Sequence, residues 1–212
     1  MAFSYLQSCS SSNLVVYQQD HDHDKDQLNL PTGYRFSPRN HELVLNYLVN
    51  KILGQKLPAN IITTIDLYQY DPPQLPISEF KYGKLNEAYF FNEREYIPSK
   101  GLAKRRTKSG YWKATGRDTQ IFYGKTVVGF KKILIFYWGR APDGKRSPWI
   151  MHEFRVNPSL IPPNSLDNNT ITTKVGKHVV CKIHYKESKE DNKPSKPKRS
   201  KKIPQIPEET KN

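Results

Sequence analysis

Cysteine is scarce in this sequence, which has only Cys9 and Cys181 among its 212 residues. Two cysteines are too few for a framework of disulfide bonds or for a thiolate zinc site of the common four-ligand kind. The low cysteine content therefore indicates a reducing compartment. We expect no bound metal and no other cofactor.

Long hydrophobic runs are also missing. No segment approaches the roughly 18 consecutive apolar residues that a membrane-spanning helix needs. The first residues lack the basic start and apolar run of a secretory signal. We therefore expect a soluble, intracellular protein without a membrane partner.

Residues that could catalyse a reaction are not suitably arranged. Cys181 and His184 are three residues apart in a strand-like segment, and His152 and Glu153 are adjacent, so each pair points to opposite faces. The Asp and His residues of positions 20–24 can bind a metal in principle, but such tracts are usually solvated. We predict that the chain is not an enzyme and has no small-molecule substrate.

Acidic residues are outnumbered by basic ones. The chain has 34 Lys and Arg against 20 Asp and Glu, which gives a net charge of +14 and an isoelectric point near 9.6. Such a balance suits a partner that is itself a polyanion. The charge alone does not say which polyanion.

Composition divides the chain into three parts. Residues 1–29 are rich in Ser, Asp and His and carry a net charge of −3, and we expect a disordered arm. Residues 30–186 contain the apolar and aromatic residues of one folded domain. Residues 187–212 have hardly any apolar residue, so a basic, disordered tail is expected.

Two helices are expected in the first third of the domain. Ser37 is suited to cap a helix whose apolar residues recur at spacings of three and four, and Gly54 is suited to end it. Residues 60–68 are predicted to form a second short helix, because prolines follow them at positions 72 and 73. Residues 157–177 are interpreted as a loop.

Strands are expected in the rest of the domain. Six short segments are rich in aromatic and β-branched residues, namely 88–91, 110–115, 127–130, 133–138, 149–156 and 179–185. Asp143-Gly144 is a hairpin signal between two of them. The connections are mostly too short for parallel crossovers, so we predict an α+β fold with a twisted antiparallel sheet flanked by a few helices.

One of these strands is bordered by basic residues. Seven Lys or Arg and no acid occur between positions 100 and 117, namely Lys100, Lys104, Arg105, Arg106, Lys108, Lys113 and Arg117. Strand alternation places Tyr111, Lys113 and Thr115 on one face, together with Arg117, and Trp112 and Ala114 on the other. This predicts a cationic ridge on an apolar base.

Such a ridge can read double-stranded DNA. Lys or Arg can donate to guanine in the major groove, and a Thr methyl can touch thymine. The flanking Lys and Arg side chains can hold phosphates. One alternative is an ordinary edge strand whose lysines discourage aggregation. Another is a single-stranded DNA or RNA module in which aromatic rings stack on bases, and burial of Trp112 would count against it.

A second basic cluster lies in the tail. Six of the ten residues 193–202 are Lys or Arg, including Lys198, Arg199, Lys201 and Lys202. Such a cluster is typical of a nuclear import signal or of a loose nucleic-acid contact.

The domain resembles the plant NAC family of transcription factors. The resemblance is carried, in family order, by Leu30–Pro38 with Glu42 and Leu43, then Tyr111–Gly116, Val128–Lys132, Phe136–Tyr137, Ala141–Pro142, Trp149–Arg155 and Val180–Lys186. It implies a dimer, homomeric or with other NAC-domain proteins, that acts in the nucleus. It also implies recognition of double-stranded DNA with a CGTG or CGTA-like core by the strand around Lys113.

The resemblance also assigns roles to residues. It matches Arg105 to a DNA-contacting arginine, Lys113 to a base-reading lysine and Arg140 to a basic position on the phosphate side. It places the opening motif, with Leu30, Pro31, Gly33, Arg35 and Glu42, at the dimer interface, where Arg35 and Glu42 would form reciprocal salt bridges. From the residues alone, an intrachain or solvated pair is the alternative for Arg35 and Glu42.

Some positions depart from the family pattern. Asn40 and His41 stand where acids are usual, Asp143 where many members have Lys, and Leu102 where Arg is frequent. A carboxylate at position 143 should weaken phosphate binding unless neighbouring basic residues compensate. Only about 26 residues follow Lys186, without acidic-hydrophobic sequence, so we expect no strong activation region there.

Overall fold

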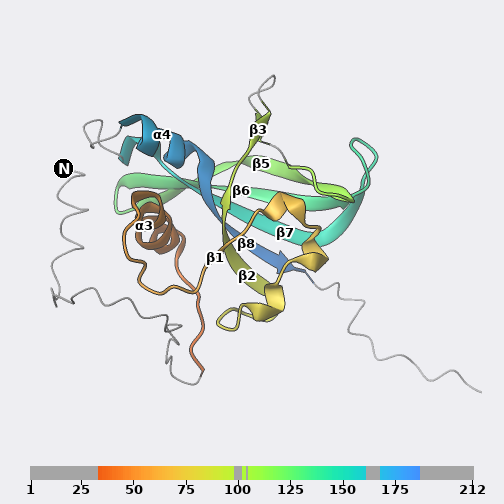
Figure 1. The fold of residues 1–212 in the computed structure, drawn as a ribbon, viewed down its shortest axis with the longest axis horizontal. Helices are drawn as coiled ribbons and strands as arrows, with labels where there is room; N and C mark the ends of the chain where they lie inside the picture. The colour runs from red at the N-terminus through yellow and green to blue at the C-terminus, as the bar shows by residue number, and fades with distance from the viewer. Residues whose placement is uncertain (1–32, 98–101, 104, 161–167, 187–212) are drawn as a thin grey trace, which may run out of the picture.

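A six-stranded sheet organises the chain, with the strand order β1-β2-β8-β7-β6-β5 (Figure 1). The computed structural model describes residues 33–97, 102–103, 105–160 and 168–186, and the expectations for residues 1–29 and 187–212 lie outside these ranges. The strands are β1 (Thr63–Thr64), β2 (Glu87–Glu93), β5 (Gly110–Tyr123), β6 (Thr126–Trp138), β7 (Lys145–Val156) and β8 (His178–Tyr185). A separate pair is formed by β3 (Tyr96–Ile97) and β4 (Leu102–Ala103).

The sheet is twisted and almost wholly antiparallel. The expected α+β class is confirmed, but β1 and β2 pair in parallel, so the predicted antiparallel pairing does not hold at this edge. The parallel pair is possible because residues 65–86 lie between the two strands, which is long enough for a crossover. The two segments predicted at 127–130 and 133–138 are one continuous strand, β6.

The second predicted helix, residues 60–68, is wrong. This segment contains β1, and a short 3₁₀ helix, η2 (Leu67–Gln69), follows it. A run of Ile and Thr from Ile61 to Ile65 disfavours a helix, because branching at Cβ restricts the side chains against the preceding turn. Pairing with the centre of β2 decides the outcome, since Thr63 lies opposite Phe90 and Thr64 opposite Phe91.

The first predicted helix is confirmed, with a later start. We call it the long helix, and it consists of α2 (Asn40–Glu42), a π-helical stretch η1 (Leu43–Leu48) and α3 (Val49–Leu53). Ser37 does not cap it. The residue before the helix is Arg39, whose backbone N–H donates to Glu42 Oε2 at 2.8 Å. Gly54 ends the helix in the left-handed conformation, with φ of 67°, as predicted.

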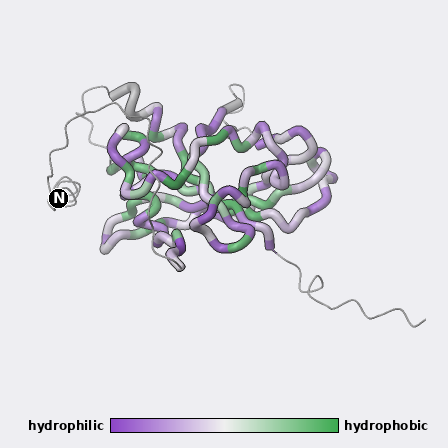
Figure 2. The backbone as a smooth tube through the Cα atoms, turned by 60° about the horizontal axis from the view of Figure 1, so that its bottom comes forward, coloured by the Kyte–Doolittle hydropathy of each residue, from purple (hydrophilic) through white to green (hydrophobic). Residues whose placement is uncertain are grey.

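The two faces of the sheet are covered by different elements. Phe36 packs edge-on against Tyr47 of the long helix and Tyr89 of β2, with ring centroids 5.3 and 5.0 Å away. The opposite face of β2 carries Asn92, whose Oδ1 accepts from the backbone N–H of Leu67 in η2 at 3.0 Å. A further 3₁₀ turn, η3 (Pro72–Gln74), continues this layer, and after η4 (Ile77–Glu79) the ring of Phe80 packs against Tyr89 on the first face. In Figure 2 the hydrophobic residues gather between the layers, and hydrophilic ones dominate the outer turns.

The predicted loop at 157–177 is also wrong. A 3₁₀ turn, η5 (Pro158–Leu160), and a ten-residue helix, α4 (Asn168–Lys177), occupy its described part. The Asn and Thr residues of α4 have low helix propensity, so tertiary contacts must support it. Val175 is buried, and Arg94 donates from Nη2 to the carbonyl of Gly176 at 2.6 Å and from its backbone N–H to that of Lys177 at 2.9 Å.

Candidate nucleic-acid interface

The predicted ridge lies on β5, one of the two edge strands of the sheet. Trp112 is only 2% exposed and packs edge-on against Phe136, with ring centroids 5.2 Å apart. Lys113 is exposed, and Tyr111 and Thr115 are half-buried on the same face. The alternation predicted from the sequence is therefore confirmed, and Trp112 cannot stack on a nucleic-acid base.

Neighbours on β6 support the ridge side chains. The rings of Tyr111 and Tyr137 stack with centroids 5.6 Å apart, and Lys113 Nζ lies 5.5 Å from the centroid of Tyr137. The hydroxyl of Thr115 donates to the carbonyl of Ile133 at 3.3 Å. Packing therefore holds the ridge. Because the hydroxyl of Thr115 bonds within the sheet, its methyl group is the part that can make an apolar contact.

The strand bends just beyond the ridge. Gly116 has a φ of 69°, and the register with β6 shifts between Thr115 and Thr119. Strand alternation therefore does not fix the direction of Arg117, although this residue is exposed. Asp118 follows it and accepts from Lys132 Nζ at 2.7 Å and from Arg155.

A turn rich in basic residues folds back onto β5. We call residues 105–109 the basic turn. The backbone N–H of Trp112 donates to the carbonyl of Arg105 at 2.8 Å, and Thr107 N–H donates to Gly110 O at 3.0 Å. Arg106 lies opposite Tyr111 in an antiparallel bridge. The exposed side chains of Arg106 and Lys108 thus lie next to the ridge, whereas Lys100 and Lys104 are outside the described residues.

Arg105 points elsewhere. Its Nη2 lies 3.7 Å from Oε1 of Glu153, which is fully buried on β7. Arg94 Nη1 and Arg155 Nε lie 3.5 and 3.9 Å from the same oxygen. The guanidinium of Arg105 therefore belongs to a cluster inside the domain, and its role as a DNA contact stays a prediction.

The turn between β6 and β7 lies beside the basic turn. The N–H of Gly139 donates to the carbonyl of Ser109 at 2.8 Å. The residue directly before Arg140 is therefore bonded to the basic turn. Arg140 and Asp143 are both exposed. A Cβ atom on Gly144 would overlap the ring of Tyr111, which shows how closely this turn packs on the ridge.

The opening motif lies at the surface before the long helix. Gly33 has a φ of 86°, and Arg35 is exposed and donates from Nη1 to the carbonyl of Tyr34 at 3.1 Å. Glu42 accepts the helix-starting bond from Arg39. Among the described ion pairs none joins Arg35 to Glu42, so the intrachain alternative is not formed. Leu30 and Pro31 lie outside the described residues.

The candidate catalytic pairs are split as expected. Cys181 is fully buried, and burial and the charge of Glu153 raise the pKa of its thiol. Cys181 lies opposite Glu153 in the sheet, whereas His184 lies opposite Ile150, on the other face. Within the described ranges no three His, Cys, Asp or Glu residues are grouped to hold a metal, and no helix is long and apolar enough to span a bilayer.

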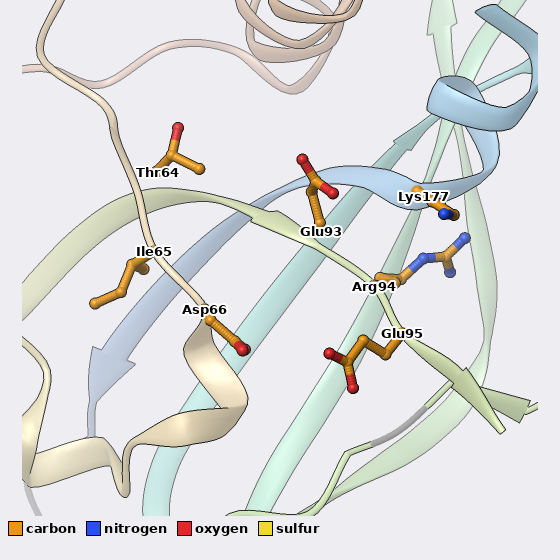
Figure 3. A pocket seen from close by; sticks show the side chains of 7 residues that line it. All are labelled: Thr64, Ile65, Asp66, Glu93, Arg94, Glu95 and Lys177. Carbon is orange, nitrogen blue, oxygen red and sulfur yellow. The ribbon is translucent and has the colours of Figure 1, made fainter. Parts of the chain in front are cut away.

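A pocket of about 650 Å³ lies near the edge strand β1 (Figure 3). Its lining residues are Thr64, Ile65, Asp66, Glu93, Arg94, Glu95 and Lys177. Asp66 accepts from Tyr68 N–H at 3.2 Å, and Glu93 pairs with His178 at 3.2 Å. These side chains support the surrounding turns and strands, and the basic turn and the ridge do not line the pocket.

Comparison with known proteins gives one consistent result. The family model described as "No apical meristem (NAM) protein" matches residues 31–156. NAC domain-containing protein 79 of Arabidopsis thaliana is 42% identical over 167 residues, which cover 78% of this chain and 49% of that protein. The chain belongs to the NAC family. NAC transcription factor 29 of the same plant is 40% identical, covering 76% and 58% of the two chains.

A further NAC relative comes from Solanum lycopersicum. NAC domain-containing protein JA2 is 44% identical over 163 residues, which cover 76% of this chain and 44% of that protein. The chain thus spans about half the length of these relatives. The matched NAC segment contains the ridge, the basic turn and the β6–β7 turn.

The NAC sheet carries a pair of histidines whose protonation should affect stability. The rings of His152 and His184 lie 5.4 Å apart on the face that also bears Lys113. Burial, then His184 and the nearby lysines Lys131 and Lys182, lower the pKa of His152 to about 4. The unfolded chain therefore binds more protons than the folded one between roughly pH 6.5 and 4, and stability falls as the pH is lowered through this window.

We expect the free energy of unfolding to be about 1 kcal/mol smaller at pH 5 than at pH 7, after allowance for solvent screening of the half-exposed ring. Urea unfolding at the two pH values measures it. In His152→Gln the difference should shrink, leaving a contribution of the same sign from His184, whose pKa is also lowered by burial. An unchanged difference in the variant would contradict the assignment. Asp71 and Asp118, whose pKa values are lowered, lose their contributions only at more acidic pH.

Proposed function

We propose that this NAC chain binds double-stranded DNA as a dimer and regulates transcription in the nucleus, without enzymatic activity. In this proposal β5 enters the major groove and reads a CGTG or CGTA-like core. The proposal rests above all on the burial of Trp112 beneath an exposed Lys113, because this arrangement presents donors to a groove and removes the large aromatic ring. It is supported by a 40% identical relative that is named a transcription factor.

Each basic element has a part in this proposal. Lys113 donates to guanine, Tyr111 and Thr115 make the adjoining groove contacts, and the exposed basic side chains beside them hold phosphates. These basic residues are Arg106, Lys108, Arg117 and Arg140, with Lys100, Lys104 and Arg105 proposed from the sequence. The tail residues Lys198, Arg199, Lys201 and Lys202 are proposed to direct nuclear import.

Duplex binding tests the proposal against single-strand binding. The full chain is titrated with a duplex containing paired CGTG cores, with a scrambled duplex and with each single strand, at several salt concentrations. We expect the cored duplex to bind at least about tenfold more tightly than the others at moderate salt, as specific binders do. Equal affinity for all ligands with a steep salt dependence would reduce the ridge to a non-specific cationic patch. Preference for single strands would favour the alternative module.

The dimer is proposed to form through the opening motif. Arg35 is exposed just before the long helix, and Glu42 is half-buried in its first turn. A two-fold interface would use each of these residues twice. The partner is a second copy or another NAC-domain protein.

We expect Arg35→Glu to weaken self-association at least about tenfold, because it places like charges in both copies of the contact. Sedimentation over a concentration series measures this effect, and Lys51→Glu on the exposed side of α3 is the matched charge reversal. Equal dimerisation of both variants would place the interface elsewhere.

A further inference from the structure

The basic turn is held in place by a carboxylate that is distant in sequence. Asp71 is only 7% exposed and stands directly before η3. Its Oδ1 accepts from the hydroxyl of Thr107 and from the backbone N–H of Ser109, the latter at 3.1 Å. Both bonds cross from the η3 layer to the turn that bears Arg106 and Lys108.

The anchor is itself fixed. The backbone N–H of Asp71 donates to Gln74 Oε1 at 2.9 Å, and the N–H of Gln74 donates to the carbonyl of Asp71 at 2.9 Å. Pro72 beside it is buried. The carboxylate therefore starts from a rigid backbone, and its position limits where the basic turn can lie.

The bonds continue from the anchor to other parts of the interface. The hydroxyl of Thr107 also accepts from the N–H of Gly110, the first residue of β5, at 3.2 Å. The carbonyl of Ser109 accepts from Gly139, next to Arg140. One carboxylate thus connects the basic turn, the start of the ridge strand and the β6–β7 turn.

The charge of Asp71 fits a positioning role. Burial would raise the pKa of this carboxyl, but the bonds from Thr107 and Ser109, with the charge of Lys108, outweigh it and hold the pKa below its usual range. The carboxylate is thus ionised at neutral pH and makes charge-assisted bonds, which are stronger than neutral ones. An acid exposed beside phosphates would repel them, whereas this one is buried behind the turn.

We propose that Asp71 is a positioning residue of the NAC interface, which holds the basic turn so that Arg106 and Lys108 reach phosphates while Lys113 reads the groove. This inference rests on the proposed function. Asp71 does not itself touch DNA in it. Its contribution appears only through the basic residues that it places.

Asp71→Ala removes both acceptor bonds and tests the inference. We expect affinity for the cored duplex to fall about fivefold to tenfold, the size of one or two lost phosphate contacts. Asp71→Asn keeps an acceptor oxygen, so its affinity for the cored duplex should lie between those of Asp71→Ala and the wild type. The matched control is Asp66→Ala, five residues earlier, which removes an acid that bonds only within the η2 segment in the described contacts and should leave affinity within about twofold.

A double-mutant cycle separates positioning from mere stabilisation. If Asp71 places Arg106, then Arg106→Ala costs several-fold affinity in the wild-type background and clearly less in the Asp71→Ala background. Equal costs in both backgrounds would overturn the inference. Should Asp71→Ala fail to fold, Thr107→Val removes the same hydroxyl bond from the other side, and the cycle is run with it.

Amide hydrogen exchange in the free protein makes the two proposals separable. The N–H of Ser109 should exchange faster in Asp71→Ala than in the wild type, whether or not DNA binds, and unchanged exchange would overturn the anchor. If exchange rises but the wild type does not prefer the cored duplex, the proposed function fails and the inference fails with it as a statement about DNA. If the wild type prefers that duplex and Asp71→Ala binds it equally well, only the inference fails.

Discussion

Glu153→Ala should lower the free energy of unfolding by about 3–5 kcal/mol, the cost typical of removing one partner from a buried ion pair. The side chain is fully buried, and the guanidinium groups of Arg94, Arg105 and Arg155 lie 3.5 to 3.9 Å from its Oε1. Alanine would leave Arg94 and Arg105 without this carboxylate and would open a cavity beside them, whereas Arg155 keeps its pair with Asp118. Two elements depend on Arg94 and Arg105, because Arg94 also supports α4 and Arg105 begins the basic turn.

Urea unfolding of Glu153→Ala and of Glu79→Ala measures this effect. Glu79 is an exposed acid on η4, so its replacement changes the net charge equally and should change stability by less than about 0.5 kcal/mol. Glu153→Gln keeps the volume and one acceptor oxygen, and should lie between alanine and the wild type. A loss of under 1 kcal/mol for Glu153→Ala would mean that water compensates the guanidinium groups.

The ridge could be predicted from the sequence because a strand with one buried face has a fixed alternation. Trp112 must enter the core, so Tyr111 and Lys113 must lie on the other face. The same rule separated Cys181 from His184. It fails at Gly116, where a bulge shifts the register, and the signal for that bulge was the glycine within the strand.

The supports of the ridge could not be predicted in the same way. Asp71 and Thr107 are 36 residues apart, and Glu153 and Arg94 are 59 residues apart. No local pattern pairs such residues. Asp71 precedes two prolines, and in the sequence these indicate only the end of a helix. Strand alternation puts Glu153 and His152 on different faces of the sheet, but nothing in the sequence indicates that this carboxylate is completely buried.

The two segments whose secondary structure was wrongly predicted share a cause. Residues 60–68 and 168–177 have weak or conflicting local preferences, so distant contacts decide their conformation. The first pairs with β2, and the second is held at its C-terminal end by Arg94. In the long helix, by contrast, the apolar spacing and Gly54 agree, and only the start was misplaced.

Lys113→Ala should weaken binding to the cored duplex by about 10- to 100-fold, because a good contact between lysine and guanine contributes about 1–3 kcal/mol of discrimination. Binding to scrambled duplex should fall much less, by the loss of a single positive charge. The affinity ratio of the two duplexes therefore carries the result. Lys113 is exposed above Tyr137, so alanine leaves the core beneath it unchanged and the variant should fold normally.

Lys125→Ala is the matched control, since this exposed lysine lies in the turn at the other end of the β5–β6 hairpin. It removes the same charge from the same hairpin, yet it should leave the affinity ratio unchanged. If both variants lose affinity equally for both duplexes, Lys113 acts only as a charge, and the core must be read by other residues. If the ratio falls for Lys113→Ala alone, the discrimination depends on this amine, because the two variants differ only in where the positive charge is lost.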